Sequence, residues 1–245
     1  DLFPDALHPI KEGATILAQT VYENISQDFG GLKLATPFTD NMVLQRNKPI
    51  VVYGTANGNE LVEVHFNQQK NTAIADTYGK WKVSFPALSS GGTYQMTIQS
   101  NKKEIILKNI VIGDVWFCSG QSNMLFELIK SKNGKEEAKQ ANANSNIRLF
   151  NSKILRDTDD TAWDSITMAK TNQLEFFSGK WAVCDSITAK DFSAIAYHFG
   201  KKIAFEENVP IGLIQVAVGG SPIESWIDRY TLEHDDKVVD VLTNW

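Results

Sequence analysis

Ser122 stands where a strand is expected to turn into a helix, a place at which a hydroxyl can attack an ester or amide carbonyl. The apolar run Val115 to Cys118 predicts a strand covered on both faces, and Ser119-Gly120 ends it. Apolar residues recur at helical spacing from Leu125 to Ile129, which puts Ser122 at a helix N-terminus. Free N–H groups and the helix dipole favour negative charge there, so the position suits a nucleophile whose attack creates an oxyanion.

A helix cap is the alternative role for Ser122, since serine is a common N-cap. Met124 replaces the second glycine of the Gly-x-Ser-x-Gly elbow, which argues against the α/β-hydrolase form of this turn. The whole stretch of residues 113–124 resembles instead the first block of the SGNH (GDSL-like) hydrolases, in the form typical of sialate O-acetylesterases and related carbohydrate acetylesterases. The resemblance implies that Ser122 is the nucleophile and that its backbone N–H belongs to the oxyanion hole.

A second strand and turn support this resemblance. Pro210 to Val218 predicts a buried parallel strand, and Gly219 and Gly220 follow it directly. Ser221 and Glu224 have the spacing of a capping box, so a helix is expected to begin there. An ordinary loop is the alternative, but the stretch resembles the second SGNH block, whose glycine donates a backbone N–H to the oxyanion hole. Either glycine fits that position.

Asp5 and His8 form an Asp-x-x-His pattern, and an apolar stripe from Ala14 to Ile25 predicts a helix after it, ending before Gly30-Gly31. The last block of SGNH hydrolases has this pattern followed by such a helix. The resemblance implies that His8 is a general base for a serine and that Asp5 orients and stabilises the imidazole. A tail that caps a helix is the alternative.

The order of these blocks is unusual, because in the family the Asp-x-x-His block follows the serine block. Either residues 1–31 end one hydrolase module and residues 113–245 begin another, or the domain is permuted and His8 serves Ser122. Tandem modules are favoured, because the family's third block, with its Asn-containing oxyanion contact, is not visible after Ser122. The chain is then a fragment of an esterase, and further hydrolase-domain sequence is expected outside it.

Residues 32–112 read as short strands separated by turn residues. Trp81, Val83 and Phe85 alternate with polar residues, which predicts a strand with one buried face, and about seven such strands suggest a small antiparallel Ig-like sandwich. Two stretches at its ends, residues 40–46 and 109–116, resemble the sandwich that precedes or is inserted into the hydrolase domain of sialate O-acetylesterases.

The predicted fold class is therefore an α/β SGNH-hydrolase type with a flavodoxin-like, partial parallel sheet plus a small all-β sandwich. The predicted domains are residues 1–31, 32–112 and 113–245. A helix capped by Asp191 should cover one face of the sheet, with apolar residues from Phe192 to Ile203 on one stripe. His198 is expected to be a structural or surface histidine, since no second ligand or carboxylate stands at i±4, and His65 is expected to be structural, since no partner stands nearby.

Charge and cysteine content exclude several classes. The net charge is −5 and no basic run interleaves with aromatic residues, which argues against nucleic acid as a partner. No apolar stretch reaches the roughly 18 residues that span a bilayer, and no signal peptide opens the chain.

Cys118 and Cys184 are either two free thiols or the two halves of one disulfide bond. The interior of a strand would make Cys118 a poor nucleophile. No Cys or His pair has the spacing typical of metal ligands, so a metal is not expected. The serine mechanism that the resemblance implies requires no cofactor.

The resemblance implies an esterase that removes acetyl groups from O-acetylated carbohydrate, with sialic acid the first-choice substrate and acetylxylan or another acetylated glycan the next. By analogy with such enzymes we expect a periplasmic or extracellular location. The alternative is a non-catalytic carbohydrate-binding or structural chain. A histidine nitrogen about 3 Å from Ser122 Oγ would favour the enzyme.

Overall fold

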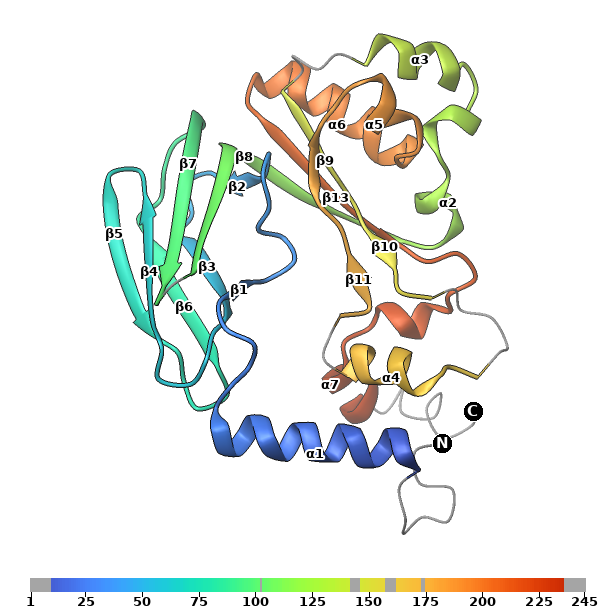
Figure 1. Cartoon of the computed structure of the whole chain (residues 1–245). Coiled ribbons are helices and arrows are strands. Elements are labelled where there is room, and N and C mark those ends of the chain that lie inside the picture. Colours follow the sequence, from blue (N-terminus) through green and yellow to red (C-terminus); the bar gives the residue numbers. More distant parts are fainter. Residues whose placement is uncertain (1–9, 102, 142–145, 157–161, 173–174, 236–245) are drawn as a thin grey trace.

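One long strand, β8 (Lys103–Gly120), runs through both parts of the molecule and joins them (Figure 1). Its sequence is rich in β-branched and aromatic residues and contains no proline, as an unbroken strand requires. Its first part pairs antiparallel with β7 (Gly91–Ser100), and its last residues, Asp114 to Gly120, pair parallel with β13 (Ile211–Ala217). The structure describes residues 10–101, 103–141, 146–156, 162–172 and 175–235.

Among the described residues, the sheet that contains β8 has eight strands in the order β12-β9-β13-β8-β7-β4-β5, with β2 paired to β8 outside this path. β13 lies parallel to β8 and β9, β2 lies parallel to β8, and the other pairs are antiparallel. This mixed sheet, with helices packed on it, confirms the α/β class. The remaining strands are β2 (Val43–Gln45), β4 (Leu61–Phe66), β5 (Gln69–Ile74), β9 (Ile147–Asn151) and β12 (Trp181–Val183).

A second, three-stranded antiparallel sheet has the order β1-β3-β6 and consists of β1 (Lys33–Leu34), β3 (Ile50–Thr55) and β6 (Lys80–Phe85). Trp81, Val83 and Phe85 are buried, as their alternation predicts, and they share one hydrophobic core with residues of β4 and β7. Phe85 packs edge-on against Phe66 of β4, with ring centroids 5.7 Å apart. The domain boundary predicted between residues 112 and 113 falls inside the continuous strand β8.

Helices cover one face of the sheet around β9 and β13 (Figure 1). Phe192 and Leu213 are fully buried where the helices meet the sheet. A Cβ on Gly200 of α6 would lie 2.5 Å from Cδ1 of Leu213 in β13, so this helix and this strand pack in close contact. The helices are α1 (Lys11–Ser26), α2 (Ser122–Leu125), η1 (Leu128–Lys130), α3 (Gly134–Gln140), α4 (Ser165–Asn172), α5 (Ser186–Lys190), α6 (Ala194–Glu207), η2 (Ile223–Trp226) and α7 (Arg229–His234). β10 (Lys153–Ile154) and β11 (Phe177–Ser178) form a separate two-stranded antiparallel sheet, with α4 between them in the sequence.

The start of α6 differs from the sequence prediction. Ser193, not Asp191, caps it, since Ser193 Oγ accepts a hydrogen bond from the N–H of Ala196 at 3.2 Å. Asp191 instead ends α5, a helix that the sequence analysis did not predict and that begins with a capping box between Asp185 and Thr188.

The outer edge of β8 is also more open than expected. Trp116 and Phe117 are 42% and 65% exposed, although a strand covered on both faces was predicted. Beyond Gly113, β8 keeps β13 on one side but has no paired strand on the other within the described residues. Trp116 is partly covered by Phe199 of α6, at 4.9 Å between ring centroids, so Phe199 faces the sheet edge and not the core.

The predicted N-terminal helix is present as α1, and Gln27 ends it in the left-handed conformation, with φ 56°. Its apolar stripe is exposed at Leu17, Val21 and Ile25. Among the described residues, no helix is long and apolar enough to cross a membrane.

Close packing fixes the point at which β8 passes from one part to the other. A Cβ on Gly113 would lie 1.9 Å from the carbonyl oxygen of Pro210, which accepts the N–H of Asp114 at 2.9 Å. The Arg46 guanidinium makes two hydrogen bonds of 2.8 Å to the Asp114 carboxylate and so holds the end of β2 at the same place.

We expect Gly113→Ala to lower the free energy of unfolding by about 2 kcal/mol, because the methyl group displaces the backbone before β13. The matched control is Gly219→Ala, since a Cβ there meets nothing closer than Leu125 Cδ2 at 3.6 Å. Urea denaturation of both variants and the parent measures the difference. Equal midpoints for Gly113→Ala and Gly219→Ala would contradict the steric account.

Candidate active site

Ser122 is the first residue of α2, directly beyond the end of β8, as the sequence predicts. Gly120 has φ 150°, a backbone conformation that residues with a Cβ rarely adopt, and this allows the abrupt change from strand to helix. The serine side chain is therefore presented at the carboxyl end of a parallel strand, where ligands of α/β sheets commonly bind.

Gln121 holds the serine and connects it to the next turn. Ser122 Oγ donates a 2.9 Å hydrogen bond to Gln121 Oε1, which also receives the Ser122 N–H at 3.4 Å. Gln121 Nε2 donates to the carbonyl oxygen of Ser221 at 3.3 Å. One amide side chain thus links the two turns that the sequence singled out.

The glycine turn follows β13 and lies against α2. The N–H of Val218 donates to the carbonyl oxygen of Gly120 at 3.1 Å, which continues the pairing of the two strands beyond their ends. Gly220 has φ 79°, while Gly219 has no positive φ and its Cβ position is in van der Waals contact with Leu125 of α2. Within the described residues, the N–H groups of both glycines lack a hydrogen-bond acceptor, so they are available to an oxygen of a bound molecule.

Ser221 shapes this turn in a way that the sequence did not predict. The expected capping box with Glu224 is not formed. Ser221 Oγ instead donates to the carbonyl oxygen of Val218 at 2.8 Å and accepts the indole N–H of Trp226 at 2.9 Å. The segment that follows is a short 3-10 helix, since the serine hydroxyl is used to close the turn.

A cleft of about 510 Å³ opens beside Gly219 and Leu125. Its lining comes from the carboxyl ends of β9 and β13, from β10 and from the ends of α2 and α5. The lining residues are Leu125, Glu127, Asn151, Ser152, Lys153, Ile154, Asp191, Gln215, Ala217, Val218 and Gly219.

Two polar residues of the cleft are fixed by hydrogen bonds to the backbone. Asn151 Nδ2 donates to the carbonyl oxygen of Asp191 at 3.2 Å, and the buried Gln215 accepts the N–H of Ser193 at 2.7 Å. Sequence analysis missed Asn151 and Lys153. The available signal was the short apolar run that starts at Ile147, because a further parallel strand brings the residues after it to the same sheet edge.

No histidine in the described part of the chain contacts Ser122, and Gln121 is the only hydrogen-bond partner of its hydroxyl there. His198 lies against Tyr197, with ring centroids 5.5 Å apart. The prediction that His65 has no partner nearby is wrong, since its Nε2 lies 2.5 Å from Glu63 Oε1. Asp5 and His8 lie outside the described residues, so the structure does not test their predicted roles.

The cysteines and acidic side chains of the described residues form no second reactive centre. Cys118 and Cys184 are both buried and form no disulfide bond with each other. Burial raises the pKa of the Cys118 thiol, which keeps it protonated and a poor nucleophile. The described residues contain no group of His, Cys, Asp or Glu side chains that could hold a metal ion.

Comparisons with known proteins converge on one family. The family model for carbohydrate esterase, sialic acid-specific acetylesterase matches residues 112–239. Sialate O-acetylesterase of Rattus norvegicus is 27% identical over 222 residues, which cover 83% of this chain and 39% of the relative. The Homo sapiens protein of the same name is 25% identical over 217 residues, covering 83% of this chain and 40% of the relative.

A solved structure agrees with these sequence matches. The crystal structure of a carbohydrate acetylesterase from Xanthomonas citri superposes with a TM-score of 0.71 at 30% identity, covering 83% of this chain and 44% of that protein. The chain therefore spans less than half the length of these similar proteins.

Proposed function

The chain belongs to the carbohydrate esterase family of sialic acid-specific acetylesterases, and we propose that it hydrolyses acetyl esters on sugars with Ser122 as the nucleophile. The supporting observation is the position of Ser122 at the start of α2, on the same sheet edge as the free N–H groups of Gly219 and Gly220. A hydroxyl beside such donors has the arrangement that acyl transfer requires.

In this mechanism Ser122 Oγ attacks the acetyl carbonyl and its proton passes to a base. The tetrahedral oxyanion is stabilised by the N–H of Ser122 and by one glycine N–H. Collapse of this intermediate breaks the ester bond, and the sugar oxygen leaves as a protonated hydroxyl. Water then attacks the acetyl-serine and releases acetate and the free serine. Both hydrogen bonds to Gln121 Oε1 have to be released in this step, the one from Ser122 Oγ when a base takes the proton and the one from the Ser122 N–H when it turns to the oxyanion.

Gly219 is the better candidate for the second oxyanion donor. It lines the cleft beside Leu125, whereas Gly220 does not line it. The N–H of Gly219 has no competing acceptor within the described residues, so an oxyanion in the cleft would not have to displace an internal hydrogen bond.

We also propose that His8 is a general base for a serine and that Asp5 orients it. Two arrangements of the modules decide which serine they serve. In tandem modules they serve another serine, and the base for Ser122 comes from sequence outside this chain. In a permuted domain they serve Ser122 directly. The non-catalytic carbohydrate-binding alternative is supported by one observation, that no described histidine contacts Ser122.

The proposal extends to the acetylated sugar, the domain division and the location of the protein. Sialic acid is the first-choice acetylated sugar, and another acetylated glycan is the second. The domain division at residues 31/32 and 112/113 stays a proposal, and an Ig-like sandwich between these two positions is supported by the core that the two sheets share. A periplasmic or extracellular location is proposed by analogy with enzymes that act on exported glycans.

Ser122→Ala in the full-length protein should leave folding intact and reduce hydrolysis of an aryl acetate by at least about three orders of magnitude, because the nucleophile is removed. The rate of aryl alcohol release measures this. Ser90→Ala, in an exposed turn, is the control and should match the parent enzyme. Turnover near the parent rate in Ser122→Ala would exclude the serine as nucleophile.

Replacing Gly219 by valine should lower kcat by about tenfold or more and change KM less, since an oxyanion donor acts chiefly in the transition state. Steady-state kinetics on an acetylated sugar separates the two constants. Gly220→Val is the comparison, and urea denaturation separates backbone strain at its φ of 79° from loss of catalysis. An effect confined to KM would assign Gly219 to substrate positioning.

His8→Ala distinguishes the two arrangements of modules. With tandem modules the change spares the activity that depends on Ser122. With a permuted domain it removes nearly all of that activity, because a serine without its base loses several orders of magnitude in rate. We expect the first result, measured as aryl acetate hydrolysis in the full-length protein, with Ser122→Ala as the zero-activity reference.

A further inference from the structure

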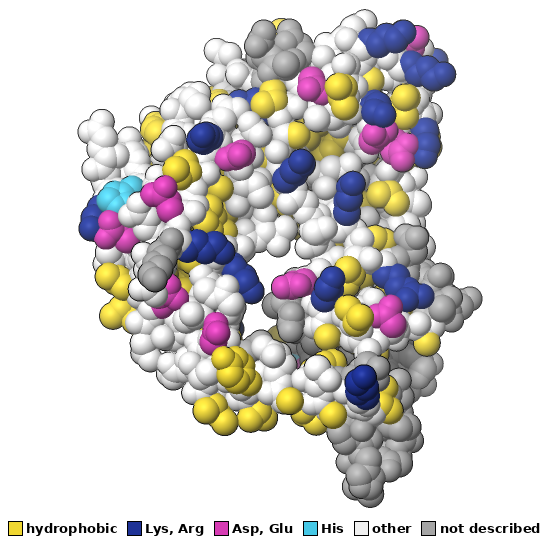
Figure 2. Space-filling model, viewed as in Figure 1, with side chains coloured by type: hydrophobic (Ala, Val, Ile, Leu, Met, Phe, Trp, Pro, Cys, Tyr) yellow, Lys and Arg dark blue, Asp and Glu magenta, His cyan; other side chains and the backbone are white. Residues whose placement is uncertain are grey.

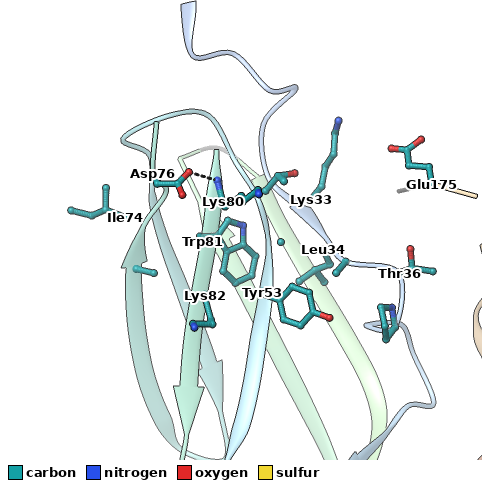
Figure 3. Close-up of a pocket in the computed structure, with 15 residues that line it drawn as sticks. Lys33, Leu34, Thr36, Tyr53, Ile74, Asp76, Lys80, Trp81, Lys82 and Glu175 are labelled. Carbon is teal, nitrogen blue, oxygen red and sulfur yellow. Dashed lines mark hydrogen bonds between the residues drawn. The ribbon is translucent and has the colours of Figure 1, made fainter. Parts of the chain in front are cut away.

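A larger cavity, of about 800 Å³, lies away from Ser122 on the outer face of the β1-β3-β6 sheet (Figure 3). Glu175, in the segment before β11, lines the cavity from the other part of the molecule. The cavity therefore lies at the hollow between the two parts (Figure 2). Its volume is in the range of about 300–1,000 Å³ typical of small-molecule sites.

Three lysines line this cavity. Lys80 and Lys82 alternate with the buried Trp81 on β6, so their side chains project outward, and Lys33 comes from β1. None of the three forms an ion pair with another described residue. In a chain of net charge −5, this concentration of unpaired ammonium groups favours a negatively charged ligand.

The carboxylates in the cavity do not neutralise these lysines by direct pairing. Asp76 Oδ1 accepts the backbone N–H groups of Tyr78 and Lys80, at 2.9 and 2.8 Å, and so is engaged in the turn before β6 (Figure 3). Glu175, from the opposite side, is the other carboxylate of the lining.

An aromatic ring lies next to the lysines. Tyr53 is directly across the strand pair from Lys82 and is 45% exposed. Its ring is supported edge-on by Phe38, with centroids 5.2 Å apart at 87°, which fixes its position while part of it stays open to the cavity. Such a ring can contact the apolar face of a sugar.

Trp81 adds a donor without an acceptor. The side chain lines the cavity and is 3% exposed, and its indole N–H has no hydrogen-bond partner within the described residues. Figure 3 shows the indole nitrogen on the edge of the ring nearer to Lys80. Because Trp81 alternates with Lys80 and Lys82, its ring lies on the core side of β6 and supports the strand that carries the two lysines.

We propose that this face is a second carbohydrate site that binds an anionic saccharide, with the sugar ring on Tyr53 and its carboxylate beside Lys80 and Lys82, which lie on the same face of β6. Charge-assisted hydrogen bonds from the ammonium groups supply the selectivity for the carboxylate. The site goes beyond the proposed ester hydrolysis, because it does not use Ser122. A nucleic acid would require a longer basic track than one cavity provides.

Calorimetric titration of the full-length protein with sialyllactose and with lactose tests the proposal, since these two unacetylated sugars differ by one carboxylated unit. Sialyllactose is expected to bind at least about tenfold more tightly than lactose, because one charge-assisted hydrogen bond to its carboxylate lowers the dissociation constant by about that factor. The double variant Lys80→Gln/Lys82→Gln and the variant Tyr53→Ala should each weaken sialyllactose binding by about tenfold or more. The control Lys103→Gln/Lys108→Gln makes the same change in net charge on exposed residues of β8 and should bind like the parent.

Three results would overturn the second site. They are equal affinity for sialyllactose and lactose, unchanged sialyllactose binding in Lys80→Gln/Lys82→Gln, and loss of binding through Lys153→Gln alone, which would place the ligand in the cleft beside Gly219. Urea denaturation confirms that each variant is folded. Retained ester hydrolysis in Ser122→Ala would reject the proposed nucleophile and leave the binding result standing, so the two proposals fail separately.

Discussion

The parallel pairing of β8 with β13 is the interaction on which the candidate site depends. The register aligns Gly120 with Ala217, so the two strands end together and their turns emerge side by side. A shift by one residue would turn every side chain of the strand to the opposite face. The Val218 to Gly120 hydrogen bond and the bridge by Gln121 then keep the serine turn and the glycine turn in contact. The geometry around Ser122 therefore follows from backbone pairing more than from the short helix that carries it.

The same strand also orders the all-β part of the molecule. Before Gly113, β8 contributes buried residues such as Ile110 and Ile112 to the core between the two sheets. At the crossing point Asp114 accepts hydrogen bonds from Arg46 and from Gln45, at 2.8 and 3.1 Å, and Gln45 also accepts the N–H of Val115. Trp181 joins the two parts a second time, since its indole N–H donates to the carbonyl oxygen of Pro37. The strand β8 thus contributes both to the hydrophobic core of the all-β part and to the position of Ser122.

Sequence patterns predicted the strands and the turns well, because an apolar run ended by glycine is a local signal. Both blocks around Ser122 and Gly219 were found in this way. The helix caps were less predictable, since Asp191 and Ser193 are equally good capping residues and only the preceding α5 decides between them. The exposure of Phe117 depends on which strands lie beside β8, which the sequence of β8 itself does not encode. The cleft residues Asn151 and Lys153 could be found only indirectly, from the apolar run that starts at Ile147, because strand order brings them to the same cleft as Gly219.

The continuity of β8 has a consequence for motion. Domains that close around a ligand rotate about a few loop residues that absorb changes in backbone dihedral angles. Here the passage between the two parts is made by hydrogen-bonded strand, and Gly113 at its centre is packed against the backbone of Pro210. Large rigid-body rotation would break paired backbone groups on both sides of that residue. The two parts are therefore restricted to small bending of a shared sheet, and the opening between them keeps a nearly constant width.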